Sequence, residues 1–334
     1  MRAQRASLRA LALAALTLAA LALAVLALRR ARPTEDTLTG ASMLPLPAVD
    51  EPPIPLPPVT PGVMTYVYNA PESSLDRRYE YHWEILKTAL ERTTAKYGPY
   101  ALVPSVGMTE ARQTSELVAA RGRITVMYLG TTPKLEHELV PVRIPVDKNL
   151  GGYCVFLIHR DAVPRFAAIH TLDDLMRLRV GLGLGWIDVD ILRANHFEVV
   201  TGSSYDGLFR MTANRRFDGF LRAAVEVLGE LELRRKEVPE LVIEDSLLLY
   251  YQLPMYFWFS KTPAGERLAE RAREGMLGMI EDGSYDRIFT AYQGPKIEAL
   301  HLKTRRLFRI ENPYLVPETP FADRRLWFDP MRSL

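Results

Sequence analysis

The sequence predicts an α/β protein whose sheets are mainly parallel and flanked by helices. Short apolar runs alternate with stretches of helical spacing between residues 171 and 226, and the same alternation occurs between residues 63 and 129. A glycine-rich turn at residues 183–186 leads from one apolar run into a helical stretch. Helices that alternate with short strands indicate parallel strands joined by crossover helices. Ligands of such sheets bind outside the carboxyl ends of the strands, which is where we expect this turn to lie.

The first 62 residues contain two segments that we place outside the predicted fold. Residues 1–32 hold six arginines, no acids and the apolar run Ala10–Leu28, so they form either a cleaved signal peptide or an N-terminal membrane anchor. Residues 33–62 are rich in proline, which favours an extended linker. Under both interpretations of the first segment, we expect the rest of the chain to be exported to the periplasm. It would contact the membrane only through that segment.

The composition argues against several classes of function. The formal net charge is +2, and subtracting the six arginines of residues 1–32 leaves −4 for the remainder, which argues against nucleic-acid binding. Cys154 is the only cysteine, so the chain can form neither an internal disulfide nor a cysteine metal site. The six histidines have no metal-binding spacing, and the sequence has no G-x-S-x-G motif. We therefore expect no metal, no cofactor and no catalytic residues.

Apolar periodicity predicts the elements of the first half of the fold. A strand opens it, and Tyr79, Trp83 and Leu86 then recur at helical spacing. A second strand, a helix that ends near residue 120 and a third strand follow. The stretch 139–152 is extended and lacks a helical period, and it leads into a strand that is apolar almost throughout. The predicted strands are residues 63–68, 100–103, 124–129 and 153–159.

Capping and turn signals predict the elements of the second half. Thr171 and Asp174 form a capping box, so a short helix begins there. Pro263 after a threonine starts a long helix, and Gly283 is placed to end it. The remaining tail is rich in arginine, aromatic residues and proline, and we expect it to pack on the first part of the fold. The predicted strands are residues 179–183, 197–200 and 217–221, and the predicted helices between them are 187–195 and 204–214.

Two segments of this region carry a resemblance to a known family. They are Arg179-Val180-Gly181-Leu182-Gly183, before the glycine turn, and Arg215-Arg216-Phe217-Asp218-Gly219, before a later strand. Their order and spacing resemble the second lobe of bacterial extracellular solute-binding proteins of the amino-acid ABC transporter type. Those proteins have the type II periplasmic binding fold. The chain looks closest to a divergent branch of that family.

The resemblance implies a two-lobed fold in which the chain crosses twice between the lobes. Each lobe would be a mainly parallel sheet flanked by helices. The first lobe would comprise residues 63–148 and 253–334, and the second would comprise residues 149–252. The first crossing would fall within residues 139–152, and the return would fall near residues 253–260.

The resemblance also implies a set of residues that contact a ligand. The set comprises Tyr68 and Asn69 after the first strand, Thr131 and Thr132 after the third, and Gly185, Trp186 and Ile187 at the glycine turn. The residues themselves leave alternatives open. Asp188 could occupy the anion-binding start of its own helix, and Trp186 could close the core instead of contacting a ligand. The loop that follows Tyr68 could be a simple turn.

Two positions depart from the family pattern. Leu135 stands where the family has an arginine that binds the ligand's carboxylate with two hydrogen bonds, and Arg143 is the residue that could replace it. Arg222 stands near the position where amino-acid binders carry an acid for the ligand's ammonium group. A cation there favours an acidic ligand. The alternative is a helix pair between Arg222 and Glu226 that faces solvent.

We therefore expect an exported solute-binding protein that closes two lobes on a small polar ligand, for which Arg222 suggests acidic character, without catalysis. The ligand would be passed to an ABC-type permease or reported to a membrane sensor. The first alternative is a membrane-tethered sensory or protein-interaction module that has lost amino-acid binding. The second is an enzyme on the same fold, which would need an acid–base pair that the sequence does not reveal.

Overall fold

The computed structural model describes residues 56, 60–71, 74–108 and 110–331, all of which belong to one compact unit, Ile54–Leu334. The predicted signal or anchor, residues 1–32, and nearly all of the predicted linker, residues 33–62, lie outside the described residues. Within the described part of the chain, no helix is both long and apolar enough to cross a membrane.

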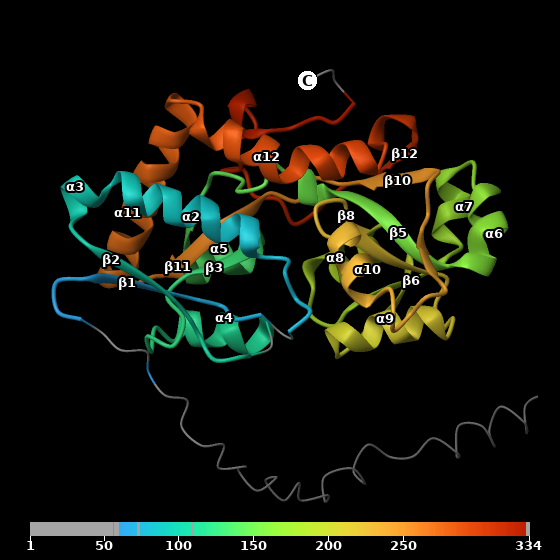
Figure 1. The fold of residues 1–334 in the computed structure, drawn as a ribbon, viewed down its shortest axis with the longest axis horizontal. Helices are drawn as coiled ribbons and strands as arrows, with labels where there is room; N and C mark the ends of the chain where they lie inside the picture. The colour runs from blue at the N-terminus through green and yellow to red at the C-terminus, as the bar shows by residue number, and fades with distance from the viewer. Residues whose placement is uncertain (1–55, 57–59, 72–73, 109, 332–334) are drawn as a thin grey trace, which may run out of the picture. The chain divides into compact units, whose positions relative to one another are not determined.

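The first lobe contains two small sheets (Figure 1). In one sheet β1 and β2 are parallel, and in the other β11 lies between β3 and β4 and runs antiparallel to both. A Cβ atom on Gly275 would lie 2.1 Å from the Ala89 carbonyl oxygen, so α11 packs directly on α2. The strands are β1 (Met64–Tyr68), β2 (Tyr100–Pro104), β3 (Met127–Gly130), β4 (Leu139–Val142) and β11 (Met255–Ser260). The helices are α2 (Glu80–Arg92), α3 (Thr94–Tyr97), α4 (Glu110–Val118), α5 (Pro133–Glu138), α11 (Pro263–Glu281) and α12 (Ser284–Ala299).

The second lobe is built on one larger sheet with the strand order β12-β10-β5-β8-β6-β7, and β9 pairs with β5 off this path. β6 is parallel to β7 and to β8, whereas β5 is antiparallel to β8, β9 and β10. The strands are β5 (Tyr153–His159), β6 (Arg179–Gly183), β7 (Glu198–Gly202), β8 (Gly219–Ala223), β9 (Leu241–Ile243), β10 (Leu247–Tyr250) and β12 (Arg306–Arg309). The helices are α6 (Val163–Ala167), α7 (Leu172–Met176), α8 (Ile187–Ala194), α9 (Tyr205–Ala213) and α10 (Val227–Arg234).

Several local signals in the sequence have the structural effect that they predict. Thr171 accepts a hydrogen bond from the Asp174 backbone N–H, and the Asp174 carboxylate accepts one from the Thr171 N–H, which completes the capping box of α7. Thr262 caps α11 through the Gly265 N–H, and Pro263 is the first residue of that helix. Gly283, just beyond α11, has a φ of +73°, which a glycine adopts without strain.

The sheets and the tail differ from the sequence prediction in two respects. The sheets are mixed rather than mainly parallel, because β5 and β11, which follow the crossings between the lobes, run antiparallel to their neighbours. The tail was predicted to pack on the first lobe as part of residues 253–334, and its end does so, with the Phe328 ring 5.2 Å from that of Phe289 in α12. The middle of the tail does not. Instead, β12 pairs in parallel with β10 of the second sheet, and Phe308 is buried there. The prediction also missed α12, whose weak apolar periodicity and internal Pro295 conceal it.

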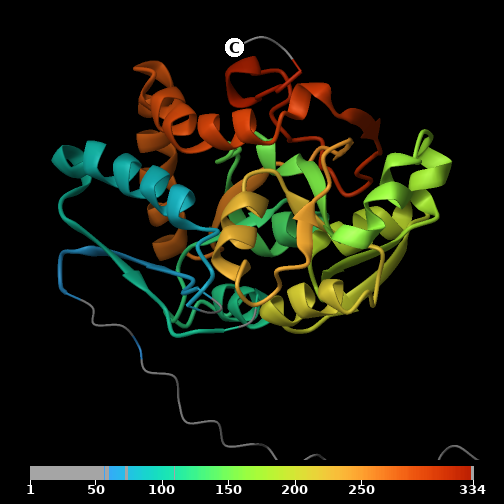
Figure 2. The same ribbon diagram turned by 45° about the vertical axis from the view of Figure 1, so that its right-hand side comes forward.

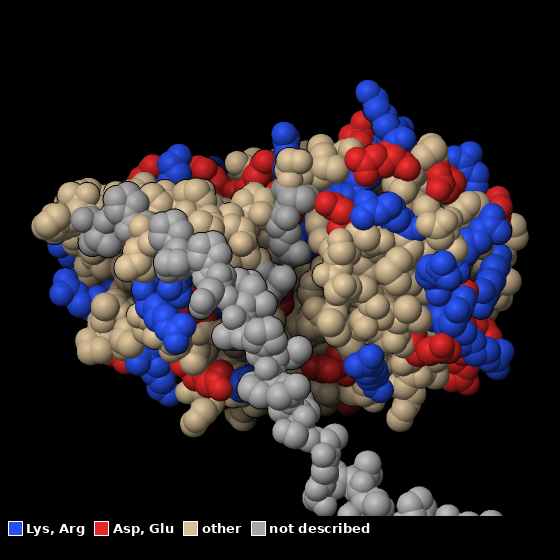
Figure 3. Space-filling view, turned by 90° about the horizontal axis from the view of Figure 1, so that it is seen from below, with Lys and Arg blue, Asp and Glu red and all other residues tan. Residues whose placement is uncertain are grey.

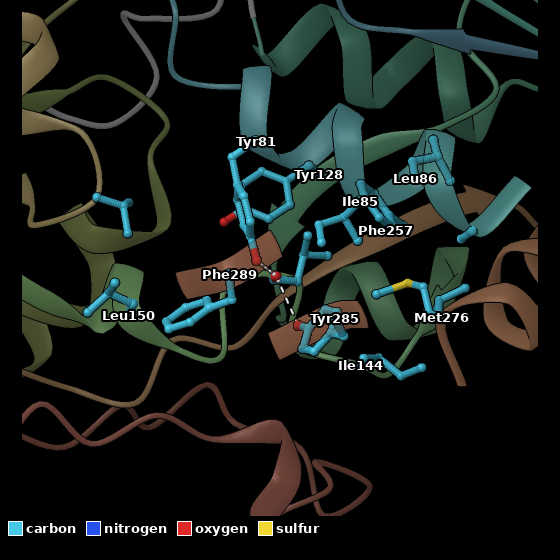
Figure 4. Packing of buried hydrophobic residues seen from close by; sticks show 14 of the residues in the cluster. Tyr81, Ile85, Leu86, Tyr128, Ile144, Leu150, Phe257, Met276, Tyr285 and Phe289 are labelled. Carbon is cyan, nitrogen blue, oxygen red and sulfur yellow. Dashed lines mark hydrogen bonds between the residues drawn. The ribbon is translucent and has the colours of Figure 1, made fainter. Parts of the chain in front are cut away.

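The first crossing segment is anchored by two tyrosines of the first lobe. The hydroxyl groups of Tyr81 and Tyr285 both donate hydrogen bonds to the carbonyl oxygen of Val146, over 2.8 Å and 2.9 Å. Figure 4 shows the two side chains converging from α2 and α12 inside the apolar core. α12 also reaches the second lobe, because Lys296 donates to the Val225 carbonyl oxygen over 2.7 Å. In Figures 1 and 2 this helix lies along the same side of both lobes.

Candidate ligand-binding site

A cleft that is partly open to solvent is lined by both lobes. Its enclosed space is about 90 Å³, which is narrow beside the roughly 300–1,000 Å³ of typical small-molecule sites, so a larger ligand would require the lobes to move apart. The apolar lining includes Tyr128 and Leu129 of β3 and Leu182 of β6. The charged lining consists of Arg78 and Glu110 from the first lobe and Asp188, Arg222 and Glu226 from the second. Both lobes therefore present charged and apolar groups to the same space.

The glycine turn shapes one wall of the cleft. A Cβ atom on Gly181 would lie 2.2 Å from the Phe217 ring, and one on Gly183 would lie 2.3 Å from the Trp186 indole, so neither position has room for a side chain. Gly185 has a φ of +89°, which turns the chain into α8. Trp186 and Ile187 line the cleft, whereas Gly185 does not. The three glycines thus make room for aromatic rings and a sharp turn.

Arg222 lines the cleft, but it is already paired with two carboxylates. Its side chain is 4% exposed, and its guanidinium donates to Glu230 over 2.6 Å and 2.8 Å and to Glu226 over 2.5 Å. The Tyr205 hydroxyl adds a hydrogen bond of 2.6 Å to Glu230. The solvent-facing pair that the sequence left open is therefore a buried network of one cation and two anions.

The two carboxylates of this network differ in pKa. Burial raises the pKa of Glu226 to about 7, because the single contact with Arg222 only partly offsets the loss of hydration. Burial also acts to raise the pKa of Glu230, but the charge and hydrogen bonds of Arg222, with the Tyr205 hydroxyl, outweigh it and leave that pKa below its usual value. Near neutral pH, Glu230 is ionised and Glu226 is close to its protonation midpoint.

Arg78, which the sequence analysis missed, reaches from the first lobe to the second. It precedes α2, and its guanidinium pairs with Asp76 over 2.8 Å and 3.0 Å. The same guanidinium lies 4.0 Å from the centre of the Tyr205 ring in the second lobe, a cation–π geometry. The available signal was an acid two residues before an arginine in the loop after the first strand. Nothing in that pattern indicates Tyr205 as the partner.

The helix start beside the glycine turn is occupied by an acid of this chain. Asp188, in the first turn of α8, lines the cleft and accepts a hydrogen bond from the Tyr251 hydroxyl. Burial raises the pKa of Asp188. An acid in the first turn of a helix is favoured by the helix dipole. Cys154, whose sulfur lies 3.5 Å from the Tyr251 hydroxyl, completes this corner.

Six of the nine residues expected at the site, Gly185 among them, do not line the cleft. Tyr68 packs on Trp83, with the ring centres 4.9 Å apart, and Asn69 is buried. The other three are Thr131, Thr132 and Arg143.

Those three residues serve the local structure around α5. Thr132 caps the helix by accepting a hydrogen bond of 3.1 Å from the Leu135 N–H. Thr131 and Arg143 both bind Glu136, over 3.0 Å and 2.5 Å. Arg143 is therefore paired with an acid of its own lobe.

The lobes touch each other directly beside the cleft. A Cβ atom on Gly130 at the end of β3 would lie 3.3 Å from a methyl group of Ile187, so the second lobe packs against this glycine. Together with the contact between Arg78 and Tyr205, this gives two direct links between the lobes.

Arginines also gather at the outer end of the second lobe, where Figure 3 shows Lys and Arg side chains together. Arg165 and Arg179 pair with Asp218 over 2.6 Å and 3.6 Å, and Arg215 pairs with Asp161. Asp218, part of the RRFDG segment, thus links α6 to the start of β6. Across the described residues, no group of three or more His, Cys, Asp or Glu side chains is arranged to hold a metal ion.

Comparison with solved structures identifies the fold. A periplasmic binding protein of an arginine transport system from Legionella pneumophila superposes with a TM-score of 0.52 at 12% identity, over 69% of this chain and 99% of the other. An amino-acid ABC transporter substrate-binding protein from Streptococcus pneumoniae, bound to L-arginine, gives 0.51 at 12% identity over 70% and 94%. A histidine kinase sensor domain similar to periplasmic binding proteins gives 0.50 at 17% identity over 70% and 97%.

No protein-family model and no curated protein matches the sequence, so the likeness lies in the structure alone. The chain has the two-lobed α/β fold of the periplasmic binding proteins.

Proposed function

We propose that this chain is an exported binding protein that holds a small polar ligand between its lobes, for uptake through an ABC-type permease or for signalling through a membrane sensor. The observation that carries the proposal is the cleft, which is lined by buried charged groups from both lobes. A ligand that contacts both lobes stabilises the closed arrangement, and the two crossing segments serve as the hinge.

The charges of the cleft favour a ligand that donates hydrogen bonds or carries positive charge. Arg222 is bound by two carboxylates, and Arg78 is bound by Asp76, so both cations are already compensated. An acidic ligand would have to compete with these internal acids. Asp188 and Glu226 instead offer acceptor oxygens to the cleft. The Streptococcus pneumoniae protein with the same fold holds L-arginine, a ligand of this charge class.

A thermal-shift screen of the full chain tests this proposal. Arginine, lysine, putrescine and glutamate are the probes, and we expect a cationic probe to raise the melting temperature while glutamate does not. A ligand at about a hundredfold excess over its Kd adds roughly 2.7 kcal/mol, which is readily detected. Asp188→Asn should weaken binding of that probe at least tenfold, because it removes the acceptor charge at the start of α8. The matched control is Asp161→Asn, on the outer surface, which should bind normally.

A shift with glutamate alone would contradict the proposed charge class, and no shift with any class would favour a second function. That function is a sensory or interaction module whose lobes stay closed without a ligand. The direct links from Arg78 to Tyr205 and from Ile187 to Gly130 favour it, as does the likeness to a sensor domain. X-ray scattering of the ligand-free protein distinguishes the two, since a module of this kind would keep its closed dimensions with and without the probes.

A further inference from the structure

A second cavity of about 170 Å³, partly open to solvent, lies beside the cleft. Arg78, Val225 and Glu226 line both spaces and so form the partition between them. The remaining walls come from the segment before α2 and from α2, α10 and α12. None of the residues expected from the sequence to contact a ligand lines this cavity.

Two buried polar side chains in its wall have atoms that make no hydrogen bond of normal geometry. His82 is 2% exposed and Gln293 is 1% exposed. Among the described residues, no partner makes a hydrogen bond of normal geometry with either ring nitrogen of His82. The same is true of the Gln293 Oε1 atom. Buried polar groups in native proteins are nearly always satisfied, so such atoms point to a bound molecule or water.

The formal charges around the cavity are balanced. Arg77, Arg78 and Lys296 face Glu80, Glu226 and Glu230 in its lining. Arg77 lies 3.8 Å from Glu80, and Lys296 donates to the Val225 carbonyl oxygen over 2.7 Å. Arg78 and Glu230 have their own partners, Asp76 and Arg222. With three basic and three acidic side chains, the lining carries no net formal charge that would select a charged ligand.

Aromatic surface completes the wall. The rings of Tyr81 and Tyr292 lie 5.6 Å apart, and Tyr292 is 40% exposed. A neutral imidazole has one nitrogen that donates and one that accepts, whereas the Gln293 Oε1 atom only accepts. Hydroxyl groups match this mixture, because each of them both donates and accepts a hydrogen bond.

We propose that this second cavity binds an uncharged polyhydroxyl compound of sugar size, with hydroxyl groups on His82 and Gln293 and one face of the molecule on Tyr292. The inference does not depend on the function proposed for the cleft, because the two spaces are separated by the partition of Arg78, Val225 and Glu226. Neutrality follows from the balanced charges, and the hydroxyl groups follow from the unpartnered atoms.

The test is calorimetric titration of the full chain with D-glucose and with myo-inositol. We expect saturable binding of at least one of them, weakened at least tenfold by His82→Phe and by Gln293→Leu. The matched control Asp161→Asn should retain the wild-type affinity. His82→Phe should also leave binding of a cationic probe in the cleft unchanged, which separates failure of this proposal from failure of the proposed function.

Two results would overturn the proposal. One is the absence of saturable binding at millimolar concentration in the wild type, which would indicate a cavity filled by water only. The other is binding that both variants retain at full strength. Because Gln293 and His82 lie on different helices, loss of folding in one variant leaves the other as a test, and circular dichroism of each variant establishes which of them is folded.

Discussion

Replacing Arg222 by methionine should lower the free energy of unfolding by about 3–5 kcal/mol, the usual cost of removing one partner from a buried ion pair. Arg222 is 4% exposed, and it is held between Glu226 and Glu230. Without it, two carboxylates remain close together in a buried environment, where each has lost its counter-charge. The loss should be greatest above neutral pH, because burial has raised the pKa of Glu226 to about 7 and that group ionises above this value.

Denaturation by guanidinium chloride, measured on either side of neutral pH, provides the test. The control is the triple variant Arg222→Met with Glu226→Gln and Glu230→Gln, in which no charge is left in the network. It should recover most of the lost stability, since neutral replacements of a buried ionic cluster are often tolerated. A loss of less than about 1 kcal/mol in the single variant would match an exposed pair and contradict the buried network.

Much of the fold could be predicted because local chemistry determines it. The capping box at Thr171 and Asp174 and the Thr262-Pro263 helix start depend on residues that are close in sequence. The glycine turn likewise led to Trp186 and Ile187, which do line the cleft. In contrast, α12 was missed because its apolar periodicity is weak and Pro295 lies inside it.

The rest of the site depends on contacts between segments that are far apart in the chain. Arg78 reaches Tyr205 across the two lobes, and no periodicity or spacing encodes that meeting. Arg222 does line the cleft, but its charge was interpreted without Glu230, which lies eight residues further on in α10. The ligand class inferred from a single charge therefore changed once both of its partners were known.

Lowering the pH below about 6.5 should destabilise the wild-type protein relative to His82→Phe, by up to about 1.4 kcal/mol per pH unit. Burial lowers the pKa of His82 to about 3, mainly through loss of hydration and with a smaller contribution from Lys296. Between that value and the pKa of about 6.5 in the unfolded chain, only the unfolded state binds the proton. The stability that neutral His82 provides is thus fully present above pH 6.5 and is lost as the pH falls toward 3.

The comparison must be made between variants, because other buried groups act in the opposite direction. Burial raises the pKa of Asp147 to about 6 and that of Glu226 to about 7. Protonation of these two carboxyl groups therefore stabilises the folded state as the pH falls through those values. Phenylalanine keeps an aromatic ring against Tyr128, which stacks on His82 at 3.7 Å, and it removes the titrating nitrogens.

Urea denaturation at several pH values between about 7 and 4 measures the difference. Gln293→Leu, in the same cavity wall but without a titrating group, should show a constant difference from the wild type. A constant difference for His82→Phe as well would mean that the imidazole is protonated inside the folded protein, which would require a partner for its charge.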